Sequence, residues 1–356
     1  MNKTYINQTP TMTSVNFGMN NYAICKDIFK NNISEFKNVE ITNNNKNIEI
    51  KKSKKVNIKL KYGLGDEALK QVLDKNNLSL DIIVKENTKN KELIIINLKL
   101  DDENKKLINN INIMLKENST ANIIINIISK NKGEFYNNSL IRTNLGKESK
   151  LKVILLNMIN SESINLFAVD NKQDDNSKLE FGIVDFGGKE SVTNYYTNLN
   201  GKNSKNNSYA IYLGNKKQSF DLNYIIEMYG KNSIADMDVQ GALGGMARKN
   251  FKGTIDFKTG CKEAKGKEEE FCILLSNKAI SKAMPILLCS EDDVEGEHAS
   301  ATGKLDEKAM FYIKSRGINK KEAEKLLVKA KLNKLIEEID DEKIKENVIK
   351  TLESKI

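Results

Sequence analysis

The sequence predicts a mainly β protein with a parallel β-solenoid core, a flanking N-terminal segment and a C-terminal α-helical domain. Short apolar or alternating runs, each about the length of a strand, follow one another through the middle of the chain. Similar turns recur between these runs, and near the end the spacing of apolar residues becomes that of amphipathic helices. These observations divide the 356 residues into an N-terminal segment (1–90), a β core (91–290) and a helical end (291–356).

The first ninety residues are polar and mixed, without the repeated runs of the core. Their apolar residues predict a short helix near residues 22–29 and a second helix at 66–73. An Asn- and Lys-rich stretch around 43–55 is typical of a loop. We expect the segments on either side of the core to cover its edge strands, because an unpaired strand edge is a liability.

A turn motif, Gly-Lys-x-Ser, repeats along the core. It begins at Gly146, Gly188, Gly201 and Gly230, with a looser copy from Gly214. The spacings lie near multiples of about 14 residues, which suits one strand plus one turn. A fixed step of this kind is typical of a solenoid, and two steps in each coil would form a flattened parallel β-helix. An antiparallel sandwich or barrel, which also spaces its strands regularly, is the alternative.

The helical end carries its own start and stop signals. Asp306 can cap a helix that ends at Gly317, a residue suited to the left-handed position after a helix. Asn319 with Glu322 forms a capping box for the next helix, and a last helix starts near residue 340 or 341. We expect the helical pattern to begin after Asp292.

Composition narrows the class of protein. The formal charge of +9 comes from lysines spread along the whole chain, and arginine is rare, so we expect no nucleic-acid partner. Cys25, Cys261, Cys272 and Cys289 form no C-x-x-C pair, which favours reduced thiols, and Cys272 and Cys289 lie in apolar runs typical of buried side chains. No signal-peptide core and no spanning run of apolar residues is evident, so we expect a cytoplasmic protein away from membranes.

The only histidine in the sequence, His298, follows an acidic run. Its imidazole is a candidate iron or zinc ligand, with Glu295, Glu297, Asp292 or Asp293 as oxygen ligands or hydrogen-bond partners. The alternative is a surface histidine in an acidic loop. No G-x-S-x-G elbow and no complete phosphate-binding loop is present, so we expect no enzyme activity and no ATP hydrolysis in this chain.

Residues 291–318, EDDVEGEHASATGKLDEKAMFYIKSRGI, resemble the signature of the SufB/SufD family, the scaffold subunits of SUF iron–sulfur cluster assembly. There an acidic stretch and a histidine precede L-D-x-x-x-x-F-Y-x-x-S-R-G. The similarity runs from about Lys116 to the C-terminus and implies a right-handed parallel β-helix with helical flanks. The signature residues matched in the helical end are Asp306, Phe311, Tyr312, Ser315, Arg316 and Gly317.

The sequence is more similar to SufD than to SufB. Glu270 stands where SufB proteins carry a cysteine, and His298 matches the SufD histidine at the nascent-cluster site. Glu297, just before it, is closer to the SufB pattern. Cys272, two residues after Glu270, would share its strand face.

The resemblance implies a non-ATPase scaffold subunit. It would pair with a SufB-like subunit and dock a SufC-like ABC ATPase through the signature residues of its helical end. His298 and Glu297 would meet a transient iron–sulfur cluster at the partner interface, and no cofactor would be bound stably by this chain alone. A SufB-like role, a homodimer, a scaffold without metal contact and, more distantly, a carbohydrate-active β-helix enzyme stay open.

Overall fold

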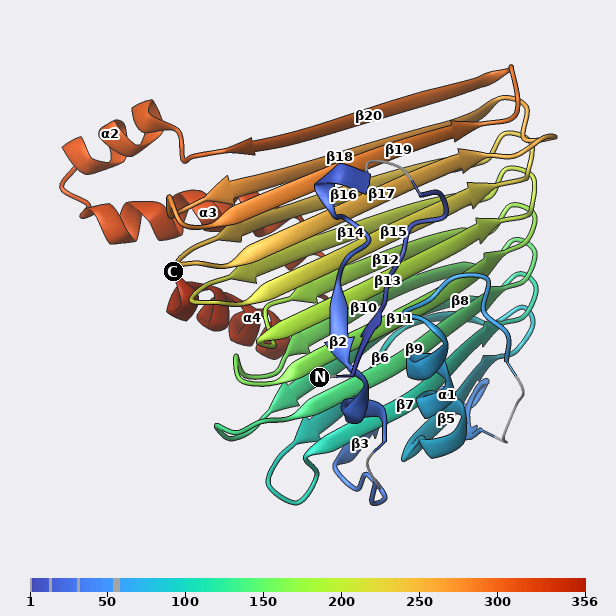
Figure 1. The fold of residues 1–356 in the computed structure, drawn as a ribbon. Helices are drawn as coiled ribbons and strands as arrows, with labels where there is room; N and C mark the ends of the chain where they lie inside the picture. Colours follow the sequence, from blue (N-terminus) through green and yellow to red (C-terminus); the bar gives the residue numbers. More distant parts are fainter. Residues whose placement is uncertain (1, 13–14, 31–32, 54–57) are drawn as a thin grey trace.

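The computed structural model describes residues 2–12, 15–30, 33–53 and 58–356. Within these ranges the core is a solenoid of about eight coils, each contributing one strand to each of two stacked sheets (Figure 1). The even sheet contains β3 (Val39–Thr42), β6 (Lys89–Leu100), β8 (Thr120–Ser129), β10 (Lys150–Met158), β12 (Lys178–Asp185), β14 (Lys205–Gly214), β16 (Ile234–Leu243), β18 (Ala264–Leu274) and β20 (Val294–Gly303). The odd sheet contains β4 (Ile48–Lys52), β5 (Leu78–Val84), β7 (Lys106–Leu115), β9 (Tyr136–Leu145), β11 (Ile164–Gln173), β13 (Glu190–Leu199), β15 (Ser219–Met228), β17 (Arg248–Phe257) and β19 (Ile280–Cys289).

The ladders between successive coils are parallel from β5 and β6 onward, which confirms the solenoid and excludes the antiparallel alternative. At the first end, β3 pairs antiparallel with β6 and β4 pairs antiparallel with β5. The remaining elements are β1 (Lys3–Tyr5), β2 (Ala23–Cys25), two 3-10 helices (Val15–Phe17 and Lys26–Phe29), α1 (Asp66–Lys75), α2 (Glu307–Ser315), α3 (Lys320–Glu337) and α4 (Glu342–Lys355).

The repeated turns stack on one another at the corners of the solenoid. In the copy from Gly201 to Ser204, the serine hydroxyl donates to the glycine carbonyl at 2.7 Å. The third residue, Asn203, has a φ of 54°, and its N–H donates to the Lys231 carbonyl of the next coil at 2.8 Å. The left-handed position turns this N–H toward the neighbouring coil, and asparagine tolerates that conformation well. The predicted step of one strand plus one turn is therefore confirmed.

The interior between the sheets is filled by every second side chain of each strand, as the alternation of a β-strand requires. Aromatic rings stack from coil to coil: the ring centroids of Phe181 and Tyr195 are 5.4 Å apart, those of Tyr195 and Tyr224 are 5.2 Å apart, and those of Tyr224 and Phe251 are 6.1 Å apart. Such offset and edge contacts add to the stabilisation from burial alone.

The outer face of each sheet is covered by a different end of the chain. The N-terminal segment and α1 lie on the odd sheet, where Ile6, Leu64 and Val72 pack against residues of β7 to β13. Helices α3 and α4 lie on the even sheet, where Leu335 packs against β12 (Figure 1). Gly182 allows this close packing, because a Cβ atom at residue 182 would lie 2.6 Å from the Leu335 Cδ1 atom and Leu335 would have to shift.

Several predictions for the flanks are confirmed. Helix α1 begins at Asp66, and Asp306, Asn319 and Asp341 accept backbone N–H hydrogen bonds at the starts of α2, α3 and α4. Gly317 follows α2 with a φ of 87°, in the left-handed region. None of the helices in the described ranges has the length and apolar character needed to cross a membrane.

Four predictions are corrected. Residues 294–303 form strand β20, so the helical region does not begin after Asp292; this run has few apolar residues, and its pairing with β18 makes it a strand. The parallel ladders therefore extend beyond residues 91–290 on both sides, from Leu78 to Gly303. The helix expected at 22–29 is β2 followed by a 3-10 helix. The loop expected around 43–55 contains β4, and residues 54 and 55 of this loop lie outside the described residues.

The buried carboxyl group of Asp185 predicts a pH dependence of stability. Asn157 and Ser191 donate to it at 2.7 and 2.6 Å, and burial raises its pKa to about 6. The folded protein holds this proton more tightly than the unfolded chain. The free energy of unfolding should therefore decrease as the pH rises from about 4 to about 6, by up to about 3 kcal/mol. Lys355 nearby, whose pKa burial lowers to about 8, stays charged in this range.

Urea unfolding of the wild type and Asp185→Asn from pH 4 to pH 7 tests this prediction. The wild type should lose stability as the pH rises, and the variant should show a flatter profile over the same range. An unchanged slope in the variant would show that Asp185 is not the responsible group.

Candidate functional site

The last coil of the solenoid ends in an open edge. Strand β20 is the terminal strand of the even sheet and pairs only with β18 among the described strands. Its side chains are almost all exposed, and His298 lies at its centre. In the part of the chain that the structure describes, the His298 ring has no hydrogen-bond partner. A nitrogen of its neutral imidazole is therefore available to coordinate a metal ion from outside the chain.

The alternation along β20 separates the predicted ligands. His298 is paired in register with Glu268 of β18, so both side chains lie on the inner face of the coil. Glu295 and Glu297 lie on the opposite face, beside Lys265 and Lys267, and Glu295 forms an ion pair with Lys265 at 2.9 Å. The structure thus does not bring Glu295 or Glu297 together with His298.

Behind His298 the interior of the solenoid becomes charged. The Lys249 ammonium group contacts the Glu270 carboxylate at 2.7 Å, and both side chains are fully buried. Tyr212 donates to the same carboxylate at 3.1 Å, and Ser300 of β20 donates to it at 2.9 Å. These bonds compensate the charge of Glu270, because a buried ion pair is tolerated only when its remaining hydrogen-bonding capacity is used.

Glu268 differs from its neighbour. Its side chain is 2% exposed, and its Oε1 atom has no hydrogen-bond partner among the described residues. The carboxyl group lies over Gly253 of the opposite sheet, where a Cβ atom would be 2.0 Å from Oε1. Burial, assisted by the charge of Glu270, raises the pKa of Glu268 to about 8.

Sequence reasoning missed Glu268 and Lys249 as parts of this site. The signal was the run Glu268–Glu270 inside a strand-like segment, since alternation places two of its three carboxylates in the interior. Nothing local to Lys249 identified it, because its partner comes from the next strand of the facing sheet. In the described part of the chain, no three His, Cys, Asp or Glu side chains form a group able to hold a metal ion.

The four cysteines are free thiols, and among the described residues none of them belongs to a group able to hold a metal ion. Cys272 is buried on the same inner face as Glu270, as expected, and burial raises its pKa. Cys289 is exposed, so the prediction of burial was wrong for this residue. The reason is its position in β19, the terminal strand of the odd sheet, over which no described strand continues the ladder.

Some signature residues of the helical end form hydrogen bonds at the ends of α2, and others are exposed aromatic side chains. Asp306 caps α2, and Ser315 donates to the Tyr312 carbonyl at 2.7 Å near its end. Phe311 and Tyr312 are 75% and 59% exposed, and the Arg316 guanidinium lies 5.1 Å from the Tyr312 ring centroid. Helix α2 has no buried residue, so its aromatic side chains form an uncovered apolar surface.

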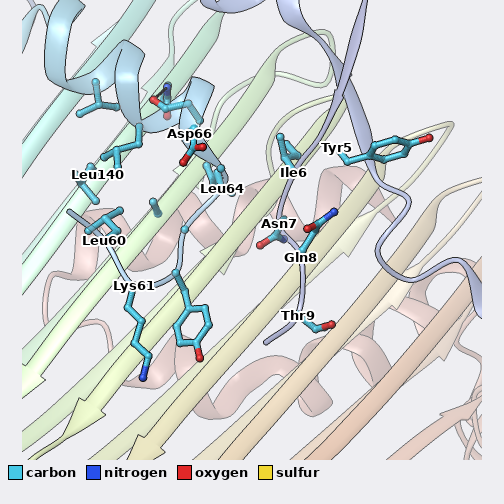
Figure 2. A pocket seen from close by; sticks show the side chains of 18 residues that line it. Tyr5, Ile6, Asn7, Gln8, Thr9, Leu60, Lys61, Leu64, Asp66 and Leu140 are labelled. Carbon is cyan, nitrogen blue, oxygen red and sulfur yellow. Dashed lines mark hydrogen bonds between the residues drawn. The ribbon is translucent and has the colours of Figure 1, made fainter. Parts of the chain in front are cut away.

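A pocket of about 280 Å³ lies elsewhere, between the N-terminal segment and the odd sheet (Figure 2). Leu60, Leu64 and Leu140 line its apolar side. Two of its polar side chains are already engaged: Asn7 donates to Asp221 at 2.7 Å, and Lys61 contacts the buried Glu227 at 2.6 Å. Among the residues that the structure describes, its lining contains no histidine or cysteine, so it offers no nucleophile and base pair of that kind.

Replacing Lys249 by methionine should destabilise the protein strongly. The change leaves the Glu270 carboxylate buried without its ammonium partner, which costs about 3 to 5 kcal/mol. Urea unfolding measures this loss. Lys265→Met is the matched control, because its ion pair with Glu295 is exposed and contributes roughly 0 to 1 kcal/mol. Equal stability of the two variants would refute this account of the interior.

Comparison with known proteins places this geometry in context. The family described as SUF system FeS cluster assembly, SufBD core domain, matches residues 98–331, which is more than half of the chain and includes β20 and α2.

Relatives that carry the name iron–sulfur cluster assembly protein SufD include proteins of Bacillus subtilis and Escherichia coli. The protein of Bacillus subtilis is 29% identical over 180 residues, 51% of this chain and 41% of the relative. The protein of Escherichia coli is 24% identical over 236 residues, 66% of this chain and 56% of the relative. An iron–sulfur cluster assembly SufBD family protein of Synechocystis is 26% identical over 155 residues, 43% of this chain and 32% of the relative. The matches thus span 32% to 56% of these relatives. The chain belongs to the SufB/SufD family of iron–sulfur cluster assembly proteins and is most like SufD.

Proposed function

We propose that this chain is a SufD-like scaffold subunit without ATPase activity, which acts in cytoplasmic iron–sulfur cluster assembly. It pairs with a SufB-like subunit through the open edge of the solenoid and docks a SufC-like ABC ATPase through α2. The observation that carries the proposal is the uncovered strand β20, with His298 at its centre, in a chain of the SufB/SufD family.

The edge of β20 supports the pairing. A terminal parallel strand presents a row of N–H and C=O groups that a strand of another chain can continue. The small side chains of Ala299, Ser300 and Ala301 leave room for close approach along this edge. A second copy of the same chain could use the edge in the same way, so a homodimer or a SufB-like role is the second candidate.

The helical end supports the ATPase contact. Helices α3 and α4 are held on the even sheet by a shared apolar cluster, while α2 projects beyond the sheets (Figure 1). Phe311 and Tyr312 are exposed on this projecting helix. Aromatic side chains that become buried on association are the usual centres of protein interfaces, and these two rings stay largely exposed in the described chain.

The nascent cluster is cargo that passes through the partner interface. His298 would offer it a neutral imidazole nitrogen, and the SufB-like subunit would supply thiolates, the ligands that iron–sulfur clusters prefer. The chain alone would then hold no cluster stably, since a single imidazole cannot retain one. Glu297, on the opposite face of β20, would act at the interface only through the partner.

A carbohydrate-active enzyme is less well supported. Three charged side chains on the outer face of the odd sheet are buried under the N-terminal segment: Asp221, Lys252 and Glu227. A polysaccharide could not reach these groups in this arrangement. A scaffold without metal contact would have the same fold and would be indifferent to changes at His298.

Co-expression with SufB-like and SufC-like subunits, followed by size-exclusion chromatography with mass determination, tests the assembly. We expect a complex of all three proteins. Replacing Phe311 and Tyr312 by alanine should weaken ATPase binding at least roughly tenfold while the SufB-like subunit stays bound. Met246→Ala, an exposed apolar side chain in a turn, is the control and should bind like the wild type. A wild-type chain that elutes alone would refute the assembly.

His298→Ala tests the role of the imidazole. The variant should fold and assemble normally, because the side chain is exposed, but the complex should accumulate markedly less cluster during anaerobic reconstitution, followed by its visible absorption. Met246→Ala, in an exposed turn, is again the control. Normal cluster delivery by the His298 variant in cells would rule out the ligand role and favour the scaffold without metal contact.

A further inference from the structure

We propose that Glu268 is a second iron ligand of this chain, which with His298 forms an entry site for a ferrous ion on the inner face of the last coils. The inference rests on the proposed function, because it assumes that iron cargo reaches the open end of the solenoid. It goes further by naming a carboxylate inside the solenoid as the partner of the imidazole.

The register of the strands brings the two side chains together. Glu268 of β18 and His298 of β20 are direct partners in a parallel ladder. Adjacent strands lie about 4.8 Å apart, and partners in register project to the same face. The imidazole is exposed at the open end and the carboxyl group lies one coil deeper, so an ion would meet His298 first and Glu268 second.

The two interior carboxylates are not equivalent. Glu270 has Lys249, Tyr212 and Ser300 as partners, and a cation placed there would also face the Lys249 ammonium group. Glu268 is equally buried, yet its Oε1 atom has no partner among the described residues. A buried oxygen without a hydrogen bond is costly and uncommon in folded proteins. A bound cation would displace the proton of this carboxyl group into solvent and supply the missing partner.

Gly253 holds the carboxyl group in this position. A Cβ atom at residue 253 would lie 2.0 Å from Oε1 and 2.9 Å from Oε2 of Glu268, so any other residue would displace the carboxyl group. The facing strand β17 thus leaves a gap opposite Glu268, and the glutamate fills it with an oxygen atom that nothing in the described chain satisfies.

One imidazole and one carboxylate suit a ferrous ion, whose borderline character accepts nitrogen and oxygen ligands. Two protein ligands give only weak binding, and water or groups of the partner subunit would complete the coordination. Such a site releases its ion readily, as an entry site for cargo must. The absence of a third His, Cys, Asp or Glu ligand in the described residues agrees with this transient role.

Anaerobic titration of the purified chain with Fe²⁺, with a chromogenic chelator as competitor, tests the site. The wild type should bind one ion, and Glu268→Gln and His298→Ala should each weaken binding at least roughly tenfold. Glu268→Asp keeps the carboxylate but shortens the side chain, so its Fe²⁺ affinity should lie between those of the wild type and Glu268→Gln. The matched control is Glu269→Gln, a change on the opposite face of β18, which should bind like the wild type. Circular dichroism and thermal unfolding establish that each variant is folded.

Absence of Fe²⁺ binding by the wild type, or equal binding by a folded Glu268→Gln variant, would overturn the inference. Assembly with the SufB-like and SufC-like subunits is measured separately and should not change in Glu268→Gln. A wild type that assembles but shows no Glu268-dependent iron binding would refute the inference alone. A wild type that fails to assemble would refute the proposed function.

Discussion

Hydrogen bonding between successive coils is the constraint on which the whole structure depends. Each strand receives its partners from the coil before it and offers the same groups to the coil after it, and the corner turns extend this pattern through residues such as Asn203. A solenoid built in this way has a terminal coil at each end, where the ladder of hydrogen bonds stops. At the first end, β3 and β4 reverse direction and pair antiparallel with the first coils. At the last end, β19 and β20 are the terminal described strands, so the unpaired groups of the ladder are gathered there.

The N-terminal segment and the C-terminal helices cover the outer faces of different sheets through different kinds of contact. Asn7 reaches the odd sheet in a left-handed conformation and bonds to Asp221, while the buried Lys252 contacts both Asp221 and the Asn7 carbonyl at 2.6 Å. Breaking such a buried pair is costly, so this contact anchors the N-terminal segment firmly. Helices α3 and α4 cover the even sheet through apolar contacts instead. The open edge and helix α2, which neither of these ends covers, are the surfaces proposed for partners.

The chemistry of the interior changes along the solenoid. In the middle coils, aromatic and aliphatic side chains fill the space between the sheets, and the polar groups are mostly amides and hydroxyls that bond to each other, as Asn137 does with Asn165. In the last coils, Lys249, Glu268 and Glu270 occupy the same inner positions. The charges of Lys249 and Glu270 compensate each other, and burial favours the protonated form of Glu268. Their concentration beside the open edge, where His298 is exposed, links the electrostatics of the interior to the surface proposed for the partner.

The sequence by itself favoured the solenoid, since a regular step of strand and turn suits coils that stack on one another, and it determined the capped helices through Asp306, Asn319 and Gly317. The parallel ladders of the structure excluded the antiparallel alternative. The sequence also identified His298 as the candidate ligand. Only the tertiary structure decided that residues 294–303 form a strand, because the pairing with β18, rather than local propensity, makes them extended. That pairing separated Glu295 and Glu297 from His298 and placed Glu268 beside it. Register between strands far apart in sequence is a long-range property, which local residue patterns do not contain.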